Sequence, residues 1–565
     1  MADPYSSRPW TKFYDAQVPA SIQYPAVSYW EHTQKAFERF PNRVCFYYMG
    51  RSLTFKQVDI LSNKFAAYLK KNGIKKGDVV GVHLPNLPAY YISLIGILKA
   101  GCILSGVSPL LTAEELENQL KDSGAKALVT ADVFFPLVKQ VLPHTKVKLL
   151  AVTGIADYLP PIKATLGKLL KKIPTGQVTT IEGVDVRRFT DIMKEMPADK
   201  IEEKVRPDDI CVIQYTGGTT GLPKGALITH RNVVGEVHQV AKWLDIREGQ
   251  DIGMTAAPFF HTAGLAIGMS FFATGMSQIA VPDPRNQEFI VSAIKKYKPN
   301  IVGQVPTIYL ELIKRPDFRA LDFKPVRVFF SGAAPFPAEH IREFESVVGG
   351  SKLVEIFGMT ETIGGAIALP LYGKKKTGSV GFPWPDVEVK LVDPETGEIV
   401  PIGEPGELLM RGPQILSKGY YNKPEETAHA IRDGWMHSGD VFKMDEDCFF
   451  FVVDRLKDMV NVSGYKVFTR ELDEVIQTHP DVAMAASVGI PNFERPGAEM
   501  VASAIVLKPG VARDAATKKK ITEYIREKVA PYKVPKVIEF MDQLPISAVG
   551  KILKREIRST MSKKT

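Results

Sequence analysis

Short apolar strands alternate with helical segments near the start of the chain, and this alternation constrains the fold more than any other feature. Residues 55–69 have helical spacing, 78–83 form an apolar strand, 89–99 a second helix and 125–130 another strand. Strands separated by helices of about 10–15 residues pair in parallel, because each helix returns the chain to the same edge of the sheet. We therefore predict a parallel sheet with helices on both faces over 54–131.

A second stretch of the same kind runs from about 207 to 360. Its apolar strands are expected at Cys211–Tyr215, Ile301–Val305, Val326–Phe330 and Leu353–Ile356. Each strand ends abruptly in small or polar residues. Ligands of open parallel sheets bind where the carboxyl ends of strands meet such loops, so we expect a ligand site at that edge.

The pattern changes again from about residue 376. Segments 387–393 and 406–411 have the two-residue period of antiparallel strands and predict a small β-barrel. The charged segment 454–458 follows as the expected hinge. Beyond it we predict a small α+β domain, with strands at 485–490, 501–507 and 537–540 and a charged helix at 515–529.

Composition excludes several classes of protein. The 565 residues suffice for about three or four compact units, and 45% apolar and 24% charged residues are typical of globular chains. A net charge of +9 is too small to indicate a nucleic-acid binder, so we expect no nucleic-acid partner. The four cysteines lie far apart without metal-ligand spacing, and the N-terminus lacks the apolar core of a signal peptide. We therefore expect a reducing, cytoplasmic location.

Two segments raise the question of membrane contact. Residues 89–106 are the most apolar run, but Lys99 and two glycines interrupt it, so a core helix followed by a strand is expected. Residues 162–173 form a basic amphipathic segment in which apolar residues at helical spacing alternate with lysines: Ile162, Leu166, Leu169, Leu170 and Ile173, with Lys163, Lys168, Lys171 and Lys172. Two interpretations stay open: peripheral contact with the inner face of an anionic membrane, or a surface helix whose apolar stripe packs on the domain.

The strongest functional signal is the segment Tyr215–Gly225, which reads YTGGTTGLPKG. Its glycines leave backbone N–H groups accessible, its threonines add hydroxyls and Lys224 adds a cation, which together are the parts of a polyphosphate site. It is not a Walker A loop, because GxxxxGK[ST] is absent from the chain. Since 226–230 reads as a strand, we expect the loop to join two strands and to use no helix dipole.

This loop resembles the signature of the adenylate-forming superfamily, and especially of its long-chain-fatty-acid–CoA ligases. Further segments resemble the other motifs of that superfamily in the same order: Phe357–Thr362 (FGMTET), Gly434–Asp440 (GWMHSGD), Asp454–Asp458 (DRLKD), Gly464–Glu471 (GYKVFTRE) and Pro545–Lys551 (PISAVGK). Thr469 stands where the fourth of these motifs usually has proline. The resemblance implies an α/β chain with a large N-terminal domain (1–453) of two α/β sheet subdomains plus a distorted β-barrel, a hinge (454–458) and a small mobile α+β C-terminal domain (459–565).

The resemblance also implies an AMP-forming acid–thiol ligase that uses ATP, Mg²⁺ and coenzyme A. A fatty acid of medium to long chain would attack the α-phosphorus of ATP, and coenzyme A would then take the acyl group from acyl-AMP. Lys551 would bridge the α-phosphate and the substrate carboxylate, and Lys224 would hold the outer phosphates. The same resemblance places His261 beside the acyl pocket, although a histidine next to two phenylalanines is equally consistent with a core position.

The remaining roles follow from the same motifs. The expected Mg²⁺ ligands are the Thr216 hydroxyl and the Glu361 carboxylate. Gly464 and Tyr465 would line the tunnel for the pantetheine of coenzyme A. The nucleotide would be bound by Thr216, Gly217, Gly218, Thr219, Thr220, Gly221, Lys224, Gly332, Ala333, Ala334, Phe357, Gly358, Met359, Thr360, Asp440 and Arg455. Small residues near His261, such as Gly264 and Gly268, would either leave room for a long apolar substrate or allow tight helix packing.

Three alternatives remain open at this level. The enzyme could be an aryl-CoA ligase of the coumarate type, or an acyl-AMP ligase that loads a carrier protein. The non-enzyme alternative is an inactive homologue that only binds nucleotide or acyl chain. The retention of Lys224, Glu361, Asp440 and Lys551 argues against the last of these. A monomer and a homodimer are equally compatible with the sequence.

Overall fold

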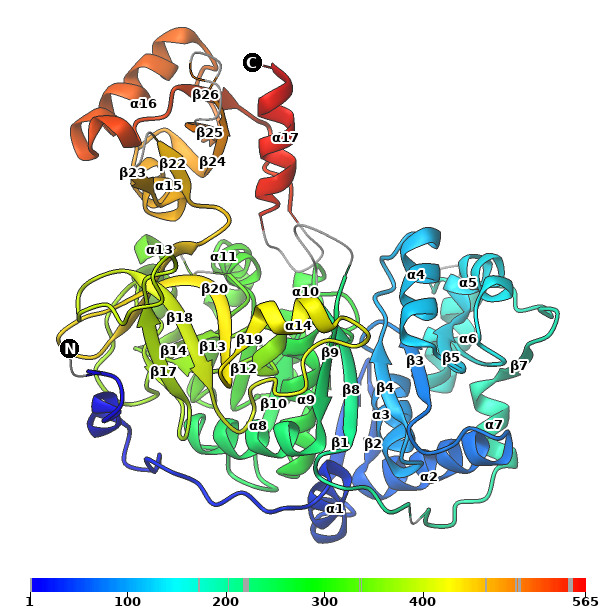
Figure 1. Cartoon of the computed structure of the whole chain (residues 1–565). Helices are drawn as coiled ribbons and strands as arrows, with labels where there is room; N and C mark the ends of the chain where they lie inside the picture. Colours follow the sequence, from blue (N-terminus) through cyan, green and yellow to red (C-terminus); the bar gives the residue numbers. More distant parts are fainter. Residues whose placement is uncertain are drawn as a thin grey trace.

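The computed structural model describes residues 3–170, 173–201, 203–216, 223–334, 336, 338–462, 465–492, 495, 499–546 and 552–564. A large N-terminal part holds two open sheets and an antiparallel β region, and a small C-terminal part stands above it in Figure 1. The two parts are joined through residues 455–460, between strands β21 and β22.

The first sheet has seven strands in the order β7-β6-β5-β3-β4-β8-β9. Its strands are β3 (Val79–His83), β4 (Ile103–Gly106), β5 (Ala127–Ala131), β6 (Leu149–Thr153), β7 (Asp185–Arg188), β8 (Ile210–Tyr215) and β9 (Gly225–Thr229). All neighbours are parallel except β8 and β9. The apolar cores on its two faces include residues of α2 (Phe55–Lys71), α3 (Pro88–Lys99) and α7 (Phe189–Glu195) on one side and of α4 (Ala113–Ser123) and α5 (Phe135–Val141) on the other. The predicted parallel sheet with helices on both faces is confirmed.

The second sheet has nine strands in the order β16-β15-β14-β13-β12-β10-β11-β1-β2. Its strands are β1 (Val44–Tyr48), β2 (Arg51–Thr54), β10 (Ile252–Thr255), β11 (Ser277–Ala280), β12 (Ile301–Gln304), β13 (Val328–Ser331), β14 (Leu353–Phe357), β15 (Ile367–Ala368) and β16 (Phe382–Pro383). Helices α8 (His230–Trp243) and α9 (Thr262–Ala273) contribute to the cores of both sheets and so lie between them. The other helices of this part are α1 (Tyr29–Arg39), α6 (Pro161–Leu169), α10 (Gln287–Tyr297), α11 (Pro306–Ile313), α12 (Pro316–Arg319), α13 (Ala338–Val348) and α14 (Pro424–Ala430).

One strand belongs to a different sheet from the one that its sequence position suggests. The strand expected at Cys211–Tyr215, grouped with the second stretch, is β8 and pairs with β4 of the first sheet. The second sheet is completed instead by β1 and β2, from near the N-terminus. Strands that are buried on both faces have the same apolar pattern in either sheet, so sequence order alone does not assign them.

The antiparallel region and the C-terminal part follow the predicted order. Strands β17 (Glu388–Val392), β18 (Gly406–Arg411), β19 (Ile431–Arg432), β20 (Trp435–Met444) and β21 (Phe450–Arg455) form one five-stranded sheet. The C-terminal part contains β22 (Val460–Val462), β23 (Tyr465–Val467), β24 (Val482–Pro491), β25 (Glu499–Leu507), β26 (Val537–Phe540), α15 (Thr469–Gln477), α16 (Ala515–Lys528) and α17 (Lys554–Lys564). The predicted α/β class, with a separate α+β unit at the end, is confirmed.

The most apolar segment of the chain is a core element. Every side chain of α3 is buried, and the ammonium of Lys99 donates to the Asp59 carboxylate at 2.5 Å and to the Asn63 side chain at 2.7 Å. Across the described ranges, no helix has the length and apolar character needed to cross a bilayer. The prediction of a core helix followed by a strand over 89–106 is confirmed by α3 and β4.

Candidate active site

The glycine- and threonine-rich loop is anchored between two paired strands, as predicted. Strands β8 and β9 form an antiparallel pair in which Tyr215 lies opposite Gly225. Just beyond it, the Thr216 N–H donates to the Lys224 carbonyl at 2.9 Å, and the Lys224 N–H donates to the Thr216 hydroxyl at 3.4 Å. Both ends of the loop are therefore fixed by the sheet. The predicted phosphate-binding residues Gly217, Gly218, Thr219, Thr220 and Gly221 lie outside the described residues.

The side chain of Lys224 lies against a segment that is about two hundred residues away in sequence. Its ammonium is paired with the Glu426 carboxylate of α14 and lies 5.4 Å from the centre of the Tyr420 ring. The side chain keeps 36% of its surface exposed, so the cation is accessible to an anionic ligand. A triphosphate at this position would compete with Glu426 for the ammonium.

Glu361 is a buried carboxylate beside the same segment, with 7% of its surface exposed. The Tyr420 hydroxyl donates to its Oε1 at 2.6 Å. Burial raises the pKa of Glu361, the Tyr420 hydrogen bond lowers it, and the charges of Asp440 and Lys224 act on it in opposite directions. These interactions bring together Lys224, Glu361 and Asp440, which come from three different elements.

The oxygen atoms available as ligands suit a hard cation. Mg²⁺ prefers oxygen ligands and is commonly held by one or two carboxylates together with phosphates and water. Glu361 supplies a buried carboxylate, and Thr216 supplies a hydroxyl at the edge of the phosphate loop. The described part of the chain contains no group of three or more His, Cys, Asp and Glu side chains that could hold a metal. The chemistry of Glu361 and Thr216 is compatible with the predicted Mg²⁺ ligands, and their role as a pair stays a prediction.

The predicted ribose-binding residues face each other on neighbouring strands. Asp440 of β20 lies opposite Arg455 of β21 in the sheet register, and Arg455 Nε is 3.1 Å from Asp440 Oδ1. Asp440 is 5% exposed, whereas Arg455 is about one-third exposed. A ribose that hydrogen-bonds to both carboxylate oxygens would have to share Asp440 with this guanidinium.

Two predicted nucleotide-binding segments, the first of them expected at the adenine, follow two adjacent parallel strands. Gly332, Ala333 and Ala334 come directly after β13, and Phe357, Gly358, Met359 and Thr360 come at and after the end of β14. The Phe336 N–H donates to the Glu355 carboxylate at 3.0 Å, which ties the first segment to β14. Ala333 has a φ of +67°, an uncommon conformation for a residue with a side chain. These segments thus meet at the carboxyl edge of the sheet, as expected.

His261 begins a helix rather than standing free in a pocket. It is the N-cap of α9, and its Nδ1 accepts a hydrogen bond from the Ala263 N–H at 3.3 Å. The glycines downstream are packed tightly. A Cβ on Gly268 would lie 1.4 Å from the Tyr91 hydroxyl, and one on Gly264 would lie 2.2 Å from the Pro258 carbonyl. Of the two interpretations of these small residues, the structure supports tight packing.

The C-terminal part presents its predicted site residue to solvent. Tyr465 is 59% exposed and stacks on Tyr532 with ring centres 4.7 Å apart, within the same domain. The predicted role of Tyr465 in the pantetheine tunnel stays a prediction. The predicted residues Gly464 and Lys551 lie outside the described residues.

Two residues of the candidate site were not predicted from the sequence. Tyr420 contacts both Glu361 and Lys224, and Glu426 is paired with Lys224. The backbone around Tyr420 also runs beside β9, since the Tyr421 N–H donates to the Gly225 carbonyl at 2.7 Å. The signal was weak: a glycine and two tyrosines before the Pro-Glu-Glu start of a helix resemble any surface turn.

Family comparison agrees with the motifs. Residues 33–421 match the family described as AMP-binding enzyme, and residues 471–551 match the AMP-binding enzyme C-terminal domain. The chain belongs to the AMP-binding enzyme family. The resemblance expected from the phosphate loop and its companion motifs is thereby confirmed over most of the chain.

Several relatives in the AMP-binding enzyme family match the chain along almost its whole length. A long-chain-fatty-acid–CoA ligase of Bacillus subtilis (strain 168) is 37% identical over 558 residues, 98% of each chain. A long-chain-fatty-acid–CoA ligase of Escherichia coli O157:H7 is 35% identical over 557 residues, 97% of each chain. Among solved structures, the anthranilate CoA ligase AuaEII in complex with anthranoyl-AMP is similar with a TM-score of 0.83 and 26% identity, over 97% of this chain and 99% of that one.

Proposed function

We propose that this protein is an AMP-forming fatty acid–CoA ligase. The observation that carries the proposal is that Tyr420 joins two of the predicted ligand residues, because its hydroxyl donates to Glu361 Oε1 at 2.6 Å and its ring centre lies 5.4 Å from the Lys224 ammonium. The substrate class rests on the two long-chain-fatty-acid–CoA ligases that match 97% or more of the chain. An aromatic acid is the second candidate, because the similar solved structure contains anthranoyl-AMP, at lower identity.

In the first half-reaction a carboxylate oxygen attacks the α-phosphorus of ATP, and the bond from that phosphorus to the departing pyrophosphate breaks. Catalysis of this kind relies on positioning and on cationic stabilisation of charge. Lys224 would leave Glu426 to bind the outer phosphates, Asp440 would bind the ribose, and Lys551 would contact the reacting oxygens. Mg²⁺ bound by Glu361 and Thr216 would neutralise phosphate charge.

In the second half-reaction the thiol sulfur of coenzyme A attacks the acyl carbonyl, the bond to AMP breaks and the thiol proton is released. The exposed position of Tyr465 supports a rotation of the C-terminal domain (459–565) about the hinge at 454–458 between the two half-reactions. Such a rotation would replace the Lys551 segment at the nucleotide by the Gly464–Tyr465 loop.

The test is pyrophosphate release with a panel of acids, namely acetate, octanoate, palmitate, benzoate and coumarate, each with and without coenzyme A. We expect release with octanoate or palmitate, and formation of the thioester when coenzyme A is added. Release with benzoate or coumarate alone would favour the aryl ligase. Adenylation without thioester formation would favour loading of a carrier protein, and no release with any acid would favour an inactive homologue.

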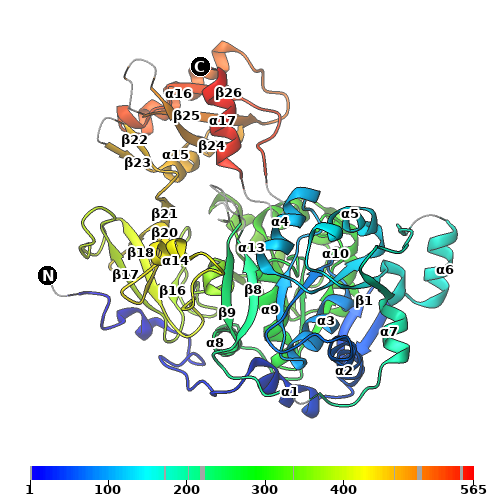
Figure 2. The ribbon, with the colours of Figure 1, turned by 45° about the vertical axis from the view of Figure 1, so that its right-hand side comes forward.

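Helix α6 supports a second proposal, peripheral contact with an anionic membrane surface. Figure 2 shows α6 at the periphery of the N-terminal part. Three of its apolar residues are largely exposed, with exposed fractions of 75% for Ile162, 50% for Leu166 and 77% for Leu169, whereas Ala164 packs against the core. Lysines flank them in sequence. An exposed apolar stripe beside basic residues suits insertion among anionic headgroups.

Vesicle flotation tests this contact. We expect binding to vesicles of phosphatidylglycerol and phosphatidylcholine, weaker binding to phosphatidylcholine alone, and loss of binding as salt increases. The variant Ile162→Ser/Leu166→Ser/Leu169→Ser should release the protein. Leu110→Ser, which changes an isolated leucine with 67% exposure outside this helix, is the matched control. Binding that ignores lipid charge, or equal loss in the control, would contradict the proposal.

A further inference from the structure

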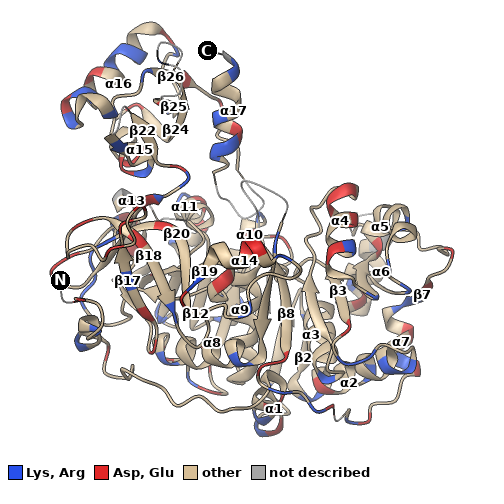
Figure 3. Cartoon of the chain, in the orientation of Figure 1, with Lys and Arg blue, Asp and Glu red and all other residues tan. Residues whose placement is uncertain are grey.

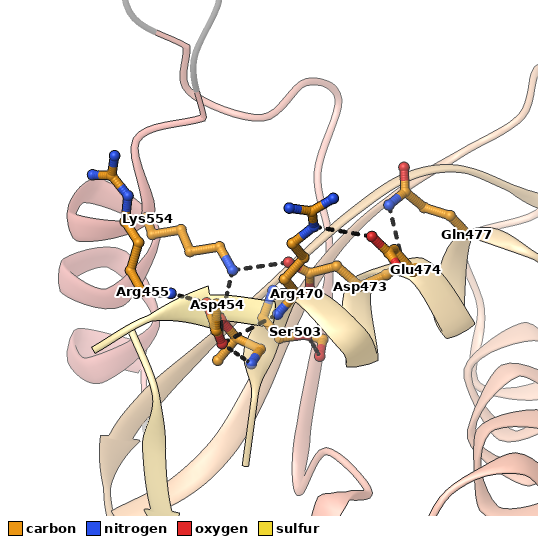
Figure 4. A network of polar contacts seen from close by, with 10 residues as sticks. Asp454, Arg455, Arg470, Asp473, Glu474, Gln477, Ser503 and Lys554 are labelled. Carbon is orange, nitrogen blue, oxygen red and sulfur yellow. Dashed lines mark hydrogen bonds and ion pairs between the residues drawn. The ribbon is translucent and has the colours of Figure 1, made fainter. Parts of the chain in front are cut away.

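A carboxylate of the N-terminal part caps a helix of the C-terminal part. Asp454 belongs to β21, which pairs with β20. The side chain of the N-cap residue of α15, Phe468, makes no capping hydrogen bond. Asp454 takes that place: its carboxylate accepts hydrogen bonds from the Thr469 N–H, from the Thr469 hydroxyl at 3.0 Å and from the Arg470 N–H at 3.3 Å (Figure 4). An anion at a helix N-terminus satisfies free N–H groups and interacts favourably with the helix dipole.

A lysine near the C-terminus completes the same cluster. Lys554, the first residue of α17, donates to the Thr469 hydroxyl at 2.7 Å and to Asp473 Oδ2 at 2.9 Å. Basic residues are frequent along α17 (Figure 3), but Arg555 and Lys563 are exposed, whereas the Lys554 side chain is only 18% exposed. Lys554 follows Lys551 by three residues. These contacts therefore fix the start of α17, three residues after the expected catalytic lysine in the sequence.

The charges of the cluster are well matched. Burial lowers the pKa of Lys554, but the carboxylates of Asp473 and Asp454 outweigh this effect and raise it, so the ammonium stays charged. Burial raises the pKa of Asp473 to about 6, against the opposing effect of Lys554. Removal of one partner would leave a buried charge without compensation, which is strongly unfavourable.

Thr469 is the residue at which this chain departs from its motif. Proline, the usual residue there, has neither an N–H nor a hydroxyl. Thr469 is fully buried, and it supplies Asp454 with two donors and Lys554 with an acceptor. The threonine therefore adds hydrogen bonds between the two parts that a proline could not make.

We propose that the hydrogen bonds of Asp454 to Thr469 and Arg470 form an interdomain latch, with Lys554 positioning the Thr469 hydroxyl, that holds the C-terminal domain in the orientation for adenylate formation and opens before the thiol step. The inference rests on the proposed function. A rotation about the hinge carries Thr469 and Lys554 away, while Asp454 stays with β20 through the pairing of β21. The outward position of Tyr465 agrees with an orientation that does not yet serve the thiol.

The half-reactions, measured separately, test the latch. For Lys554→Met we expect pyrophosphate release without thiol to fall about tenfold, while thioester formation from preformed acyl-AMP is retained, because residues of one hydrogen-bond network are energetically coupled. Lys554→Arg should recover most of the loss. The matched control is Lys533→Met, because Lys533 is 19% exposed and pairs with Glu471 of the same helix at 2.8 Å, whereas Lys554 donates to the Thr469 hydroxyl that binds Asp454. In Lys533→Met the ratio of the pyrophosphate-release rate to the thioester-formation rate should not change.

Thr469→Pro keeps the experiment decisive if Lys554→Met fails to fold. Proline is favoured at the first position of a helix, and Phe468 before it is already extended, so the fold should tolerate the change. We expect the ratio of the pyrophosphate-release rate to the thioester-formation rate to fall about threefold. All four native cysteines are buried, so spin labels at Glu404→Cys and Glu527→Cys report the domain orientation independently of activity.

The outcomes separate the latch from the proposed function. The latch predicts that Thr469→Pro broadens the distance distribution between the two labels. Equal loss of both half-reactions, or an unchanged distribution, would overturn it. If the wild-type enzyme released no pyrophosphate with any acid, the proposed function would fail instead, and the label distances would still decide whether the cluster fixes the domains.

Discussion

On the N-terminal side of the candidate site the functional residues lie on or beside the strands of the large sheets, whereas Tyr465, the described site residue of the C-terminal side, begins a strand of the two-stranded β22–β23 pair. Thr216 and Lys224 close a strand pair, and Asp440 and Arg455 face each other across another. Tyr465, by contrast, is mostly exposed to solvent. The first set is fixed by the sheet hydrogen bonds of the fold, while the second depends on how one domain is oriented on the other.

This difference predicts separate roles for the two sides of the site. A nucleotide-binding site must keep its hydrogen-bond donors in place throughout the reaction cycle, because donors that are already in position stabilise charge without rearrangement. A domain that serves two half-reactions must exchange the groups that it presents. The fixed side should therefore control nucleotide and metal binding, and the movable side should control which half-reaction proceeds.

Lys551→Ala is expected to have the largest effect. Loss of the ammonium at the reacting oxygens should reduce pyrophosphate release by about 100- to 1000-fold. Because the fixed side is untouched, the Kd for ATP, measured by calorimetry, should change little. Lys563→Ala, an exposed lysine of the same terminal segment, is the control. A large loss of ATP affinity would contradict the separation of duties.

Gly464→Leu changes the other half-reaction. A side chain at the expected pantetheine tunnel should obstruct the thiol, so thioester formation should fall by about 100-fold while pyrophosphate release without thiol is preserved. Rapid-quench measurement of the two products gives both rates from one sample. An equal loss of both rates would mean that Gly464 does not act in the thiol step alone.

The sequence predicts local features better than contacts between distant segments, and the reason is physical. The phosphate loop between two strands follows from local pattern, because Gly and Thr have few other uses at that density. The sheet to which Cys211–Tyr215 belongs cannot be predicted in this way, because a strand that is buried on both faces has the same apolar pattern in either sheet. Tyr420 was also missed, since its contact with Glu361 joins residues far apart in the chain. Likewise, helical spacing predicts that 162–173 is amphipathic but not that its stripe faces solvent.

Tyr420→Phe tests how one hydroxyl on the fixed side affects metal binding. The change removes the hydroxyl that holds the Glu361 carboxylate at 2.6 Å and leaves the ring beside Lys224. Groups that orient a metal ligand are typically worth about 10–100-fold in metal affinity, and we expect the lower end of that range. The measurement is the Mg²⁺ concentration for half-maximal pyrophosphate release, together with Mg²⁺-dependent nucleotide binding by calorimetry. Tyr421→Phe, at the neighbouring tyrosine, should leave both unchanged.

Glu355→Gln acts on stability rather than on either half-reaction. Burial raises the pKa of Glu355 from 4.5 to about 7, so the folded protein binds a proton that the unfolded chain has released. The stabilisation is therefore complete below about pH 4.5 and is lost as the pH rises to about 7, by about 3 kcal/mol at 1.36 kcal/mol per pKa unit. Glutamine can still accept from the Phe336 N–H but does not titrate.

Calorimetric unfolding of both proteins between pH 4.5 and 8 measures this difference. The Tm of the wild type should fall relative to that of Glu355→Gln through the window and then run parallel to it. Charges of Arg470 and Glu474 on α15 also act on Glu355, in opposite directions. If Glu355 belongs to the fixed side, the same pH dependence should persist in Thr469→Pro, in which the latch is weakened. Parallel curves for wild type and Glu355→Gln would show that this carboxyl is ionised in the folded protein, and a dependence altered by Thr469→Pro would place Glu355 with the movable side.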